Sequence, residues 1–310
     1  MNFYKEIDKK ISNLNNEVKI LLVDNDPIIN ETLDFFKNHP KIKLFKYADI
    51  KNKYKNALLD KKDFYYELRK GKESHEVVNS TFDKYDELYS SLILLKKGYF
   101  HGVVGGLSYT SADFIRATLK IIGLAPNTER LSSLMFLVKD DNTLFFSDPS
   151  VNIDINEKTL YNIGKNHIDF LEKLNIKSNL AFLSFSTYGS VQNEQTNKIR
   201  EVAKLLQDQI ENRKVIGEVQ FDAAFDKEVR YKKTKDNNLY NIDFTSFVFP
   251  DLNSANIGYK LVQYLAKYDA FGPILLGLNQ PANDLSRGAK IKDIIYTIYI
   301  TVLQIGDKNE

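Results

Sequence analysis

The chain has 310 residues, enough for one large domain or two lobes, and its hydrophobic fraction of 43% supports a substantial core. Lys and Arg total 43 against 41 Asp and Glu, so the net charge of +2 lacks the basic excess typical of nucleic-acid-binding proteins. The absence of cysteine excludes disulfides, thiolate metal sites and a cysteine nucleophile. The N-terminus mixes charges and no apolar run approaches the roughly 18 residues of a membrane span, so we expect a soluble, cytoplasmic protein.

The first half of the chain alternates apolar runs typical of strands with helical patterns. Strands are predicted at 18–23, 41–45 and 102–106, a hairpin at 134–138 and 143–146, and helices at 31–36 and 111–122. The segment 51–80 is rich in Lys, with apolar residues at helical spacing.

The second half repeats this alternation. Helices are predicted at 159–174 and 195–210, strands at 180–185, 215–221, 243–249 and 272–278, and an exposed loop at 232–238. Such alternation predicts an α/β architecture with mainly parallel sheets in two lobes. Ligands of such sheets bind at the loops that follow the carboxyl ends of strands. The turn-rich segments that follow predicted strands, and are therefore candidate binding loops, are 105–106, 186–190, 251–257 and 280–288.

Ordered motifs are more specific than this periodicity. The C-terminal third contains Phe249-Pro250-Asp251-Leu252-Asn253, Gly272-Pro273-Ile274-Leu275 and Asn283-Asp284-Leu285-Ser286-Arg287-Gly288. Upstream lie Glu67-Leu68-Arg69-Lys70, Ser184-Phe185-Ser186-Thr187 and Gly217-Glu218-Val219-Gln220. With these motifs in this order, the chain resembles the phosphate acetyltransferases, or phosphotransacetylases, of the phosphate acetyl/butyryl transferase family.

The resemblance implies two α/β lobes with an interlobe cleft, as in the isocitrate/isopropylmalate dehydrogenase-like fold. The first lobe would hold 1–147 plus 284–310, and the second 148–283. The implied activity is reversible acetyl transfer between coenzyme A and inorganic phosphate, by a homodimer. Coenzyme A is then a substrate, and we expect no cofactor, metal, nucleic acid or membrane partner.

Carried over by motif position, the catalytic residues are Ser286, Arg287 and Asp293. The residues expected to bind substrate are Arg69, Arg116, Ser186, Thr187 and Ser190. The chain also departs from the family. Val23-Asp24 stands where the family has Pro-Glu, and Gly105-Gly106 replaces a Ser-Gly turn.

The proposed chemistry needs these residue types. A thiol has a pKa near about 8.5, so attack by coenzyme A gains from a base, and we assign this role to Asp293, whose pKa partial burial should raise. Ser286 and Arg287 would stabilise the charge that develops on the carbonyl oxygen. Arg69 and Arg116 can hold phosphate through forked hydrogen bonds that Lys cannot reproduce.

Structural interpretations of the same residues remain open. Ser286 could cap a helix, and Asp293 could interact with a helix dipole. Arg69 could belong to a solvated basic face, and Arg116 could pair with Asp113. The hydroxyls at 186–190 could satisfy a loop backbone, Gly105 and Gly106 could permit a tight turn, and the β-branched segment 293–302 could be a strand or a helix.

Three other functions compete with acetyl transfer. The first is a related acyltransferase that favours butyryl or another short chain. The second is a non-catalytic module that senses coenzyme A, against which the complete set of Ser286, Arg287 and Asp293 argues. The third is RNA binding through the Lys-rich segment 41–72, which lacks a recognition motif.

Overall fold

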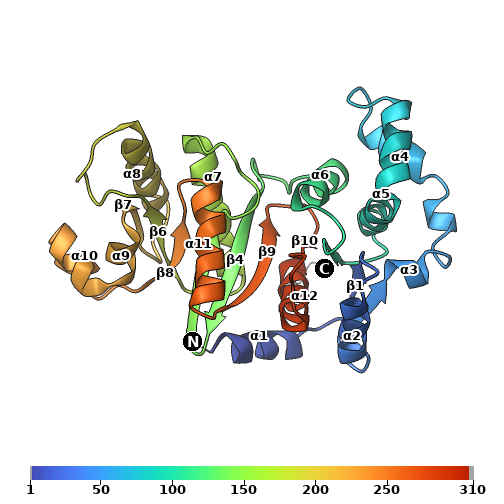
Figure 1. Cartoon of the computed structure of the whole chain (residues 1–310), viewed down its shortest axis with the longest axis horizontal. Coiled ribbons are helices and arrows are strands. Elements are labelled where there is room, and N and C mark those ends of the chain that lie inside the picture. The colour runs from blue at the N-terminus through green and yellow to red at the C-terminus, as the bar shows by residue number, and fades with distance from the viewer. Residues whose placement is uncertain (1, 307–310) are drawn as a thin grey trace. The chain divides into compact units, whose positions relative to one another are not determined.

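The computed structural model describes residues 2–306 and divides into two compact units. Unit 1 contains Glu129–Ala270 with the residues that precede Tyr4, and unit 2 contains Tyr4–Thr128 with the residues from Phe271 onward. Unit 1 is thus formed mainly by one continuous segment, whereas unit 2 is assembled from two segments far apart in sequence (Figure 1). The chain passes from one unit to the other after Thr128 and after Ala270, whereas the lobe boundaries were predicted after 147 and 283. The predicted hairpin therefore lies in unit 1.

Both units alternate strands and helices. Unit 1 holds β4 (Ser132–Lys139), β5 (Asn142–Ser147), α7 (Glu157–Lys173), β6 (Asn179–Leu183), α8 (Glu194–Gln207), β7 (Val215–Val219), α9 (Phe221–Phe225), α10 (Lys227–Thr234), η2 (Asn237–Leu239), β8 (Phe244–Val248) and α11 (Leu252–Leu265). Unit 2 holds β1 (Val18–Leu22), α2 (Pro27–Phe36), β2 (Ile42–Lys46), α3 (Tyr47–Ile50), η1 (Asn56–Leu58), α4 (Lys61–Leu68), α5 (His75–Lys96), β3 (Gly102–Gly105), α6 (Ser111–Ile121), β10 (Ala282–Asp284) and α12 (Ile291–Ile305). Two elements, α1 (Phe3–Ser12) and β9 (Asp269–Leu276), carry the chain across the divisions.

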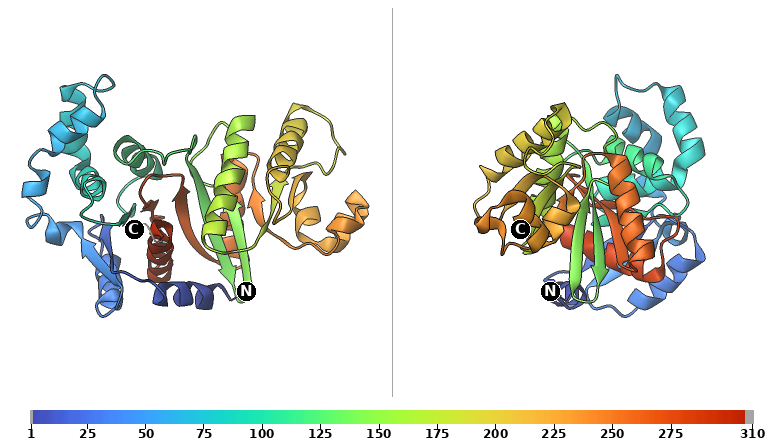
Figure 2. Two further views of the ribbon diagram at one scale, coloured as in Figure 1. Left: turned by 180° about the vertical axis from the view of Figure 1, so that it is seen from behind. Right: turned by 60° about the vertical axis from the view of Figure 1, so that its left-hand side comes forward.

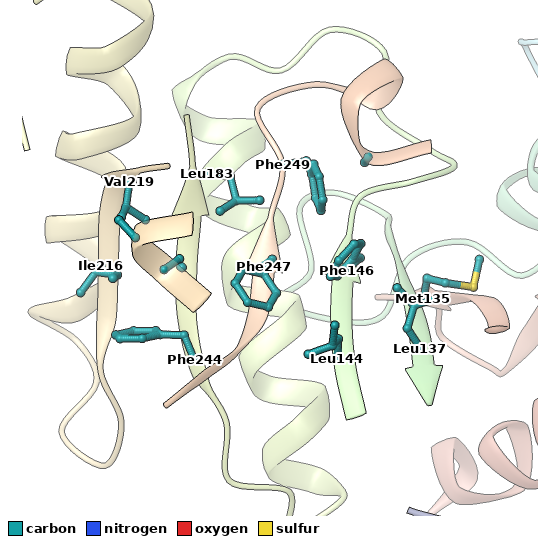
Figure 3. Close-up of a cluster of buried hydrophobic side chains, with 14 of the residues drawn as sticks. Met135, Leu137, Leu144, Phe146, Leu183, Ile216, Val219, Phe244, Phe247 and Phe249 are labelled. Carbon is teal, nitrogen blue, oxygen red and sulfur yellow. The ribbon is translucent and has the colours of Figure 1, made fainter. Parts of the chain in front are cut away.

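The sheet of unit 1 is covered by helices on both faces. Its strands run in the order β7-β6-β8-β5-β4, parallel except for the β4–β5 hairpin. Along β6, Ala181 and Leu183 point into a core shared with α9 and α11, whereas Leu180 and Phe182 point into the core beneath α7 and α8. Figure 3 shows the first of these cores. This alternation is the period of two that a strand buried on both faces requires.

The sheet of unit 2 has four parallel strands in the order β10-β3-β1-β2. Helix α12 packs against α2 and β3, while α5 contacts β3 and α6 contacts β10. Helix α12, the dark red helix of the further views (Figure 2), also contacts β10. Strand β10 therefore places the C-terminal segment in the same sheet as β1, β2 and β3, which come from the N-terminal part of the chain.

The structure confirms the predicted α/β class with mainly parallel sheets, and the predicted strands and hairpin all occur. The ambiguous segment 293–302 is helical, because it lies within α12. Two local predictions are wrong. The predicted loop at 232–238 contains the end of α10, which Asp226 caps, and the 3-10 turn η2. The segment 251–257 is not a loop either, because Asp251 caps α11 and the helix starts at Leu252.

None of the helices within residues 2–306 has both the length and the apolarity that crossing a lipid bilayer requires.

Candidate functional site

The segment that carries Ser286 and Arg287 is anchored by strand β10. Asp284 pairs with Gly105 of β3, and the Leu285 amide donates a hydrogen bond to the Gly105 carbonyl at 2.7 Å. These contacts fix the backbone immediately before Ser286.

The Asn283 side chain ties the same strand to its neighbours. Its amide nitrogen donates to Thr301 Oγ1 at 2.8 Å and to Gln304 Oε1 at 2.6 Å, both on α12. Its carbonyl oxygen accepts from the Leu275 amide of β9 at 2.8 Å. Because Asn283 is fully buried, each of these bonds replaces one that water would otherwise supply.

Ser286 and Arg287 themselves are exposed between β10 and α12. Ser286 does not cap α12, whose first residue is Ile291 and whose cap is Lys290. Its hydroxyl oxygen accepts a long contact of 3.4 Å from the Gly288 amide. Both side chains are therefore open to solvent, as groups that contact a substrate must be.

Asp293 lies in the first turn of α12 and is half-buried. Its Oδ2 accepts a hydrogen bond from the Lys290 amide at 2.9 Å, which orients the carboxylate at the helix N-terminus. This contact matches the alternative interpretation of Asp293, in which its carboxylate interacts with the dipole of the helix. Ser286 and Asp293 do not share a continuous helix, because α12 begins five residues after Ser286, at Ile291.

A second turn lies next to β10. The carboxylate of Asp24, which follows β1, accepts the amide hydrogens of Gly106 at 2.8 Å, Leu107 at 3.2 Å and Ser108 at 2.8 Å. Gly106 has a φ of +129°, a conformation that favours glycine. Since these three amides are already bonded to Asp24, the Gly105-Gly106 segment is a tight turn rather than a phosphate cradle.

Asp284 contacts this turn from the other side. A Cβ placed on Gly106 would lie 2.1 Å from Asp284 Oδ1, so only glycine fits there. Asp284 is fully buried, and neither of its carboxylate oxygens has a hydrogen bond of good geometry among the described residues. Burial raises the pKa of Asp284 and nearby Asp24 adds to this shift, whereas Ser111 and Arg287 partly oppose it, so that the pKa is about 7.

Arg69 follows α4 and is only 22% exposed, so it does not belong to a solvated face. Its Nε donates to Glu73 at 3.2 Å, and Glu73 also accepts from Lys120 at 2.8 Å and Tyr65 at 2.8 Å. Burial alone would raise the pKa of Glu73, but hydrogen bonds from Lys120, Tyr65 and Arg69 lower it below its ordinary value. Glu73 thus holds two cations together in unit 2.

Arg116, on α6, pairs with Asp113 at 2.8 Å, as the structural interpretation expected. A hydrogen bond from Thr110 is the main cause of a lowered pKa of Asp113. The Arg116 side chain is nevertheless 56% exposed, so its guanidinium remains accessible. Exposed ion pairs of this kind contribute little to the stability of the fold.

The hydroxyls of the loop after β6 are satisfied within unit 1. Ser186 Oγ contacts Ser190 Oγ at 3.0 Å, and Thr187 Oγ1 accepts from the Gln220 amide at 3.0 Å. Ser186 and Thr187 are also buried. Their proposed contacts with substrate stay a prediction, and their observed bonds shape the loop.

Glu218 organises this loop. It is fully buried and accepts hydrogen bonds from Gly189 N at 2.7 Å, Ser186 Oγ at 3.0 Å and Arg200 Nε at 2.8 Å. Burial would raise the pKa of Glu218, but the Arg200 pair and the Gly189 and Ser186 hydrogen bonds lower it. The same loop borders a surface pocket of about 510 Å³, which Arg200 and Lys204 help to line.

The structure brings Ser286, Arg287 and Asp293 into one short segment of unit 2, the unit that also contains Arg69 and Arg116. Ser186, Thr187 and Ser190 belong to unit 1. No role was predicted for Asn283, Asp284 or Glu218, although all three lie in the sequence motifs. For Glu218 the available signal was a charged side chain within the otherwise apolar strand β7. Asn283 and Asp284 make up most of the three-residue strand β10, which has no apolar pattern for them to interrupt.

Within residues 2–306, no group of three or more His, Cys, Asp or Glu side chains is arranged to hold a metal ion.

Comparisons with known proteins agree on one family. A family model described as phosphate acetyl/butaryl transferase matches residues 14–302. A phosphate acetyltransferase of Mycoplasma capricolum is 38% identical over 78% of this chain and 76% of its own length. The structure of a Streptococcus pyogenes phosphotransacetylase superposes with a TM-score of 0.84 at 30% identity, covering 98% of this chain and 99% of that one. A Staphylococcus aureus EutD phosphotransacetylase gives a TM-score of 0.80 at 29% identity, with 97% of both chains covered.

Replacing Glu218 by alanine should destabilise the protein by about 2 kcal/mol, because Arg200 and the Gly189 amide lose their shared partner. Arg200 is partly exposed, so the decrease in the free energy of unfolding should be smaller than for a fully buried ion pair. Chemical denaturation measures the difference. Glu201→Ala, an exposed neighbour on α8, is the control, and equal effects of the two substitutions would contradict the role given to Glu218.

Proposed function

Because the chain belongs to the phosphate acetyl/butaryl transferase family, we propose that it catalyses reversible transfer of an acetyl group between coenzyme A and inorganic phosphate. The observation that carries this proposal is the segment from Asn283 to Asp293, in which buried anchors position exposed Ser286 and Arg287. Relatives that are 35–38% identical are named phosphate acetyltransferases. The cytoplasm is the location that this activity implies.

In the proposed reaction, the coenzyme A thiol attacks the carbonyl carbon of acetyl phosphate within a ternary complex. The thiol proton passes to the Asp293 carboxylate as the C–S bond forms. The bond between the carbonyl carbon and the oxygen that bridges to phosphorus then breaks, and phosphate leaves with the bonding electron pair. Ser286 and Arg287 donate hydrogen bonds to the carbonyl oxygen while it carries negative charge.

The cations of unit 2 fit the phosphate part of the reaction. Arg116 has an exposed guanidinium, and Arg69 is held by Glu73 so that its remaining N–H groups can contact an anion. Direct attack by the thiol requires no covalent acyl-enzyme, and Ser286 lacks the Gly-x-Ser-x-Gly setting of a serine nucleophile.

Phosphate-dependent release of coenzyme A from acetyl-CoA tests the proposal directly. Turnover of acetyl-CoA well above that of butyryl-CoA would support an acetyl substrate, and the reverse order would favour the short-chain alternative. No release with either substrate would favour the non-catalytic coenzyme A sensor.

We also propose that the protein is a homodimer that associates through helix α11. Only Ala255 of this helix is buried, whereas one stripe along it is 53–77% exposed and consists of Ile257, Leu261, Tyr264 and Leu265. Apolar residues at this helical spacing form a continuous patch, which a second copy of the chain can cover symmetrically.

Asp293→Asn should lower kcat by about 100-fold or more, because the amide cannot accept the thiol proton. The substrate KM values should change little, since the asparagine oxygen can still accept the Lys290 amide hydrogen and so preserve the helix start. Steady-state kinetics in both directions provides the measurement. An unchanged kcat would remove Asp293 as the base.

Arg69→Ala should raise the KM for an anionic substrate by about tenfold, with a smaller effect on kcat, because one forked phosphate contact is lost. Lys70→Ala is a matched control, since Lys70 is 67% exposed and pairs with Glu67 at the surface. If both variants behave like the unmodified protein, Arg69 does not bind substrate.

Leu261→Asp should weaken dimerisation by tenfold or more in Kd, on the order of 1.4 kcal/mol, because it places a charge in the apolar stripe of α11. Analytical ultracentrifugation over a concentration series measures the effect. Leu59→Asp controls for surface charge, because Leu59 is 73% exposed and lies in unit 2. A monomeric unmodified protein would contradict the proposed dimer.

A further inference from the structure

Asp284 is a buried acid that the proposed mechanism leaves without a role. It precedes Ser286 by two residues, ends strand β10 and is fully removed from solvent. Neither carboxylate oxygen has a hydrogen bond of good geometry among the described residues, although the Ser111 hydroxyl lies close enough to favour the ionised form. An ionised carboxylate in such a place would lose its hydration without compensation.

The groups around Asp284 do not supply that compensation. Asp24, which follows β1, is a second acid, and its oxygens take all three donors of the adjacent turn, the amides of Gly106, Leu107 and Ser108. Ser111 at the start of α6 and Arg287 after β10 also face Asp284 and favour its ionised form, but burial and Asp24 outweigh them. Arg287 is exposed, which limits its effect on a buried group.

Asp284 is also packed tightly against the turn. Its Oδ1 lies where a Cβ of Gly106 would have to be, and the Leu285 backbone contacts the same position at 2.8 Å. The carboxyl group therefore has no room to move toward the turn without displacing Gly106, and the Leu285 backbone that borders the same space leads directly to Ser286 and Arg287.

We propose that Asp284 is a positioning residue that acts as a neutral carboxylic acid, holding the Ser286–Arg287 segment against the Gly106 turn in the active protein. This inference rests on the proposed function, because it assigns Ser286 and Arg287 to the reaction. When Asp284 loses its proton, a second negative charge arises beside Asp24 and attracts Arg287. The segment then leaves the arrangement in which its side chains meet the substrate.

A pKa of about 7 for Asp284 places this change in the neutral range. The ordinary Asp pKa is about 3.9, so between these two values the folded chain holds a proton that the unfolded chain does not. The stability due to this proton is complete below about pH 4 and is lost as the pH rises through about 7. The Asp284→Asn variant cannot ionise at this position and should lack this dependence.

The first test compares Asp284→Asn with the unmodified protein in kcat/KM for phosphate from about pH 6 to about pH 8.5. The ratio of variant to unmodified protein should rise with pH on the order of tenfold, because only the unmodified protein ionises at this position. Phosphate and the coenzyme A thiol also ionise in this range, but their ionisation affects both proteins equally and therefore cancels in the ratio. Asp154→Asn, an exposed acid of unit 1, is the control and should give a constant ratio.

A second arm measures thermal unfolding and does not need activity. The Tm of Asp284→Asn relative to the unmodified protein should increase by several degrees between about pH 5 and about pH 8. A pH-independent activity ratio together with a pH-independent Tm difference would overturn the proposal. If neither protein releases coenzyme A at any pH, the proposed function fails, whereas the Tm comparison still decides whether Asp284 is neutral.

Discussion

The buried amide of Asn283 is the interaction on which the candidate site depends most. It joins strands β9 and β10 to helix α12 through three hydrogen bonds in the protein interior. An apolar residue could fill the same volume, but it would leave the Leu275 amide and the α12 side chains unsatisfied, at a cost of about 1–3 kcal/mol for each buried group. The exposed segment that contains Ser286 and Arg287 therefore follows directly from a strand that buried polar contacts hold in place.

Acidic groups in unit 2 have three distinct environments. Asp24 is surrounded by backbone N–H groups and closes a turn, and Glu73 is surrounded by cations and a phenol and orients them. Asp284 has neither kind of partner. The same side-chain chemistry thus serves as a turn cap, as a holder of arginine and lysine, and as a proton-binding group. The departure of this chain from the family at Asp24 and Gly105-Gly106 concerns two groups that contact each other.

Much of the architecture could be predicted from the sequence, because strand and helix periods are local. The β4–β5 hairpin follows from the Asp140-Asp141-Asn142 turn, and Asp140 has the positive φ that such turns use. The end of α10 was missed, since its residues are polar and only the Asp226 cap marks it as helical. The sequence motifs pointed to Ser286, Arg287 and Asp293 as candidate site residues, and these roles stay a prediction. The motifs could not indicate the burial of Asp284, because it arises only when β10, β1 and the Gly106 turn meet in space.

The pairing of β10 with β3 has a consequence for biosynthesis. Residues 282–284 leave the ribosome long after β1, β2 and β3, and they follow the whole of Glu129–Ala270. Unit 1 can therefore complete its own core during translation, while the open edge of β3 waits for its last neighbour. Until residues 282–284 have left the ribosome, that edge is an unpaired strand that can pair with another chain.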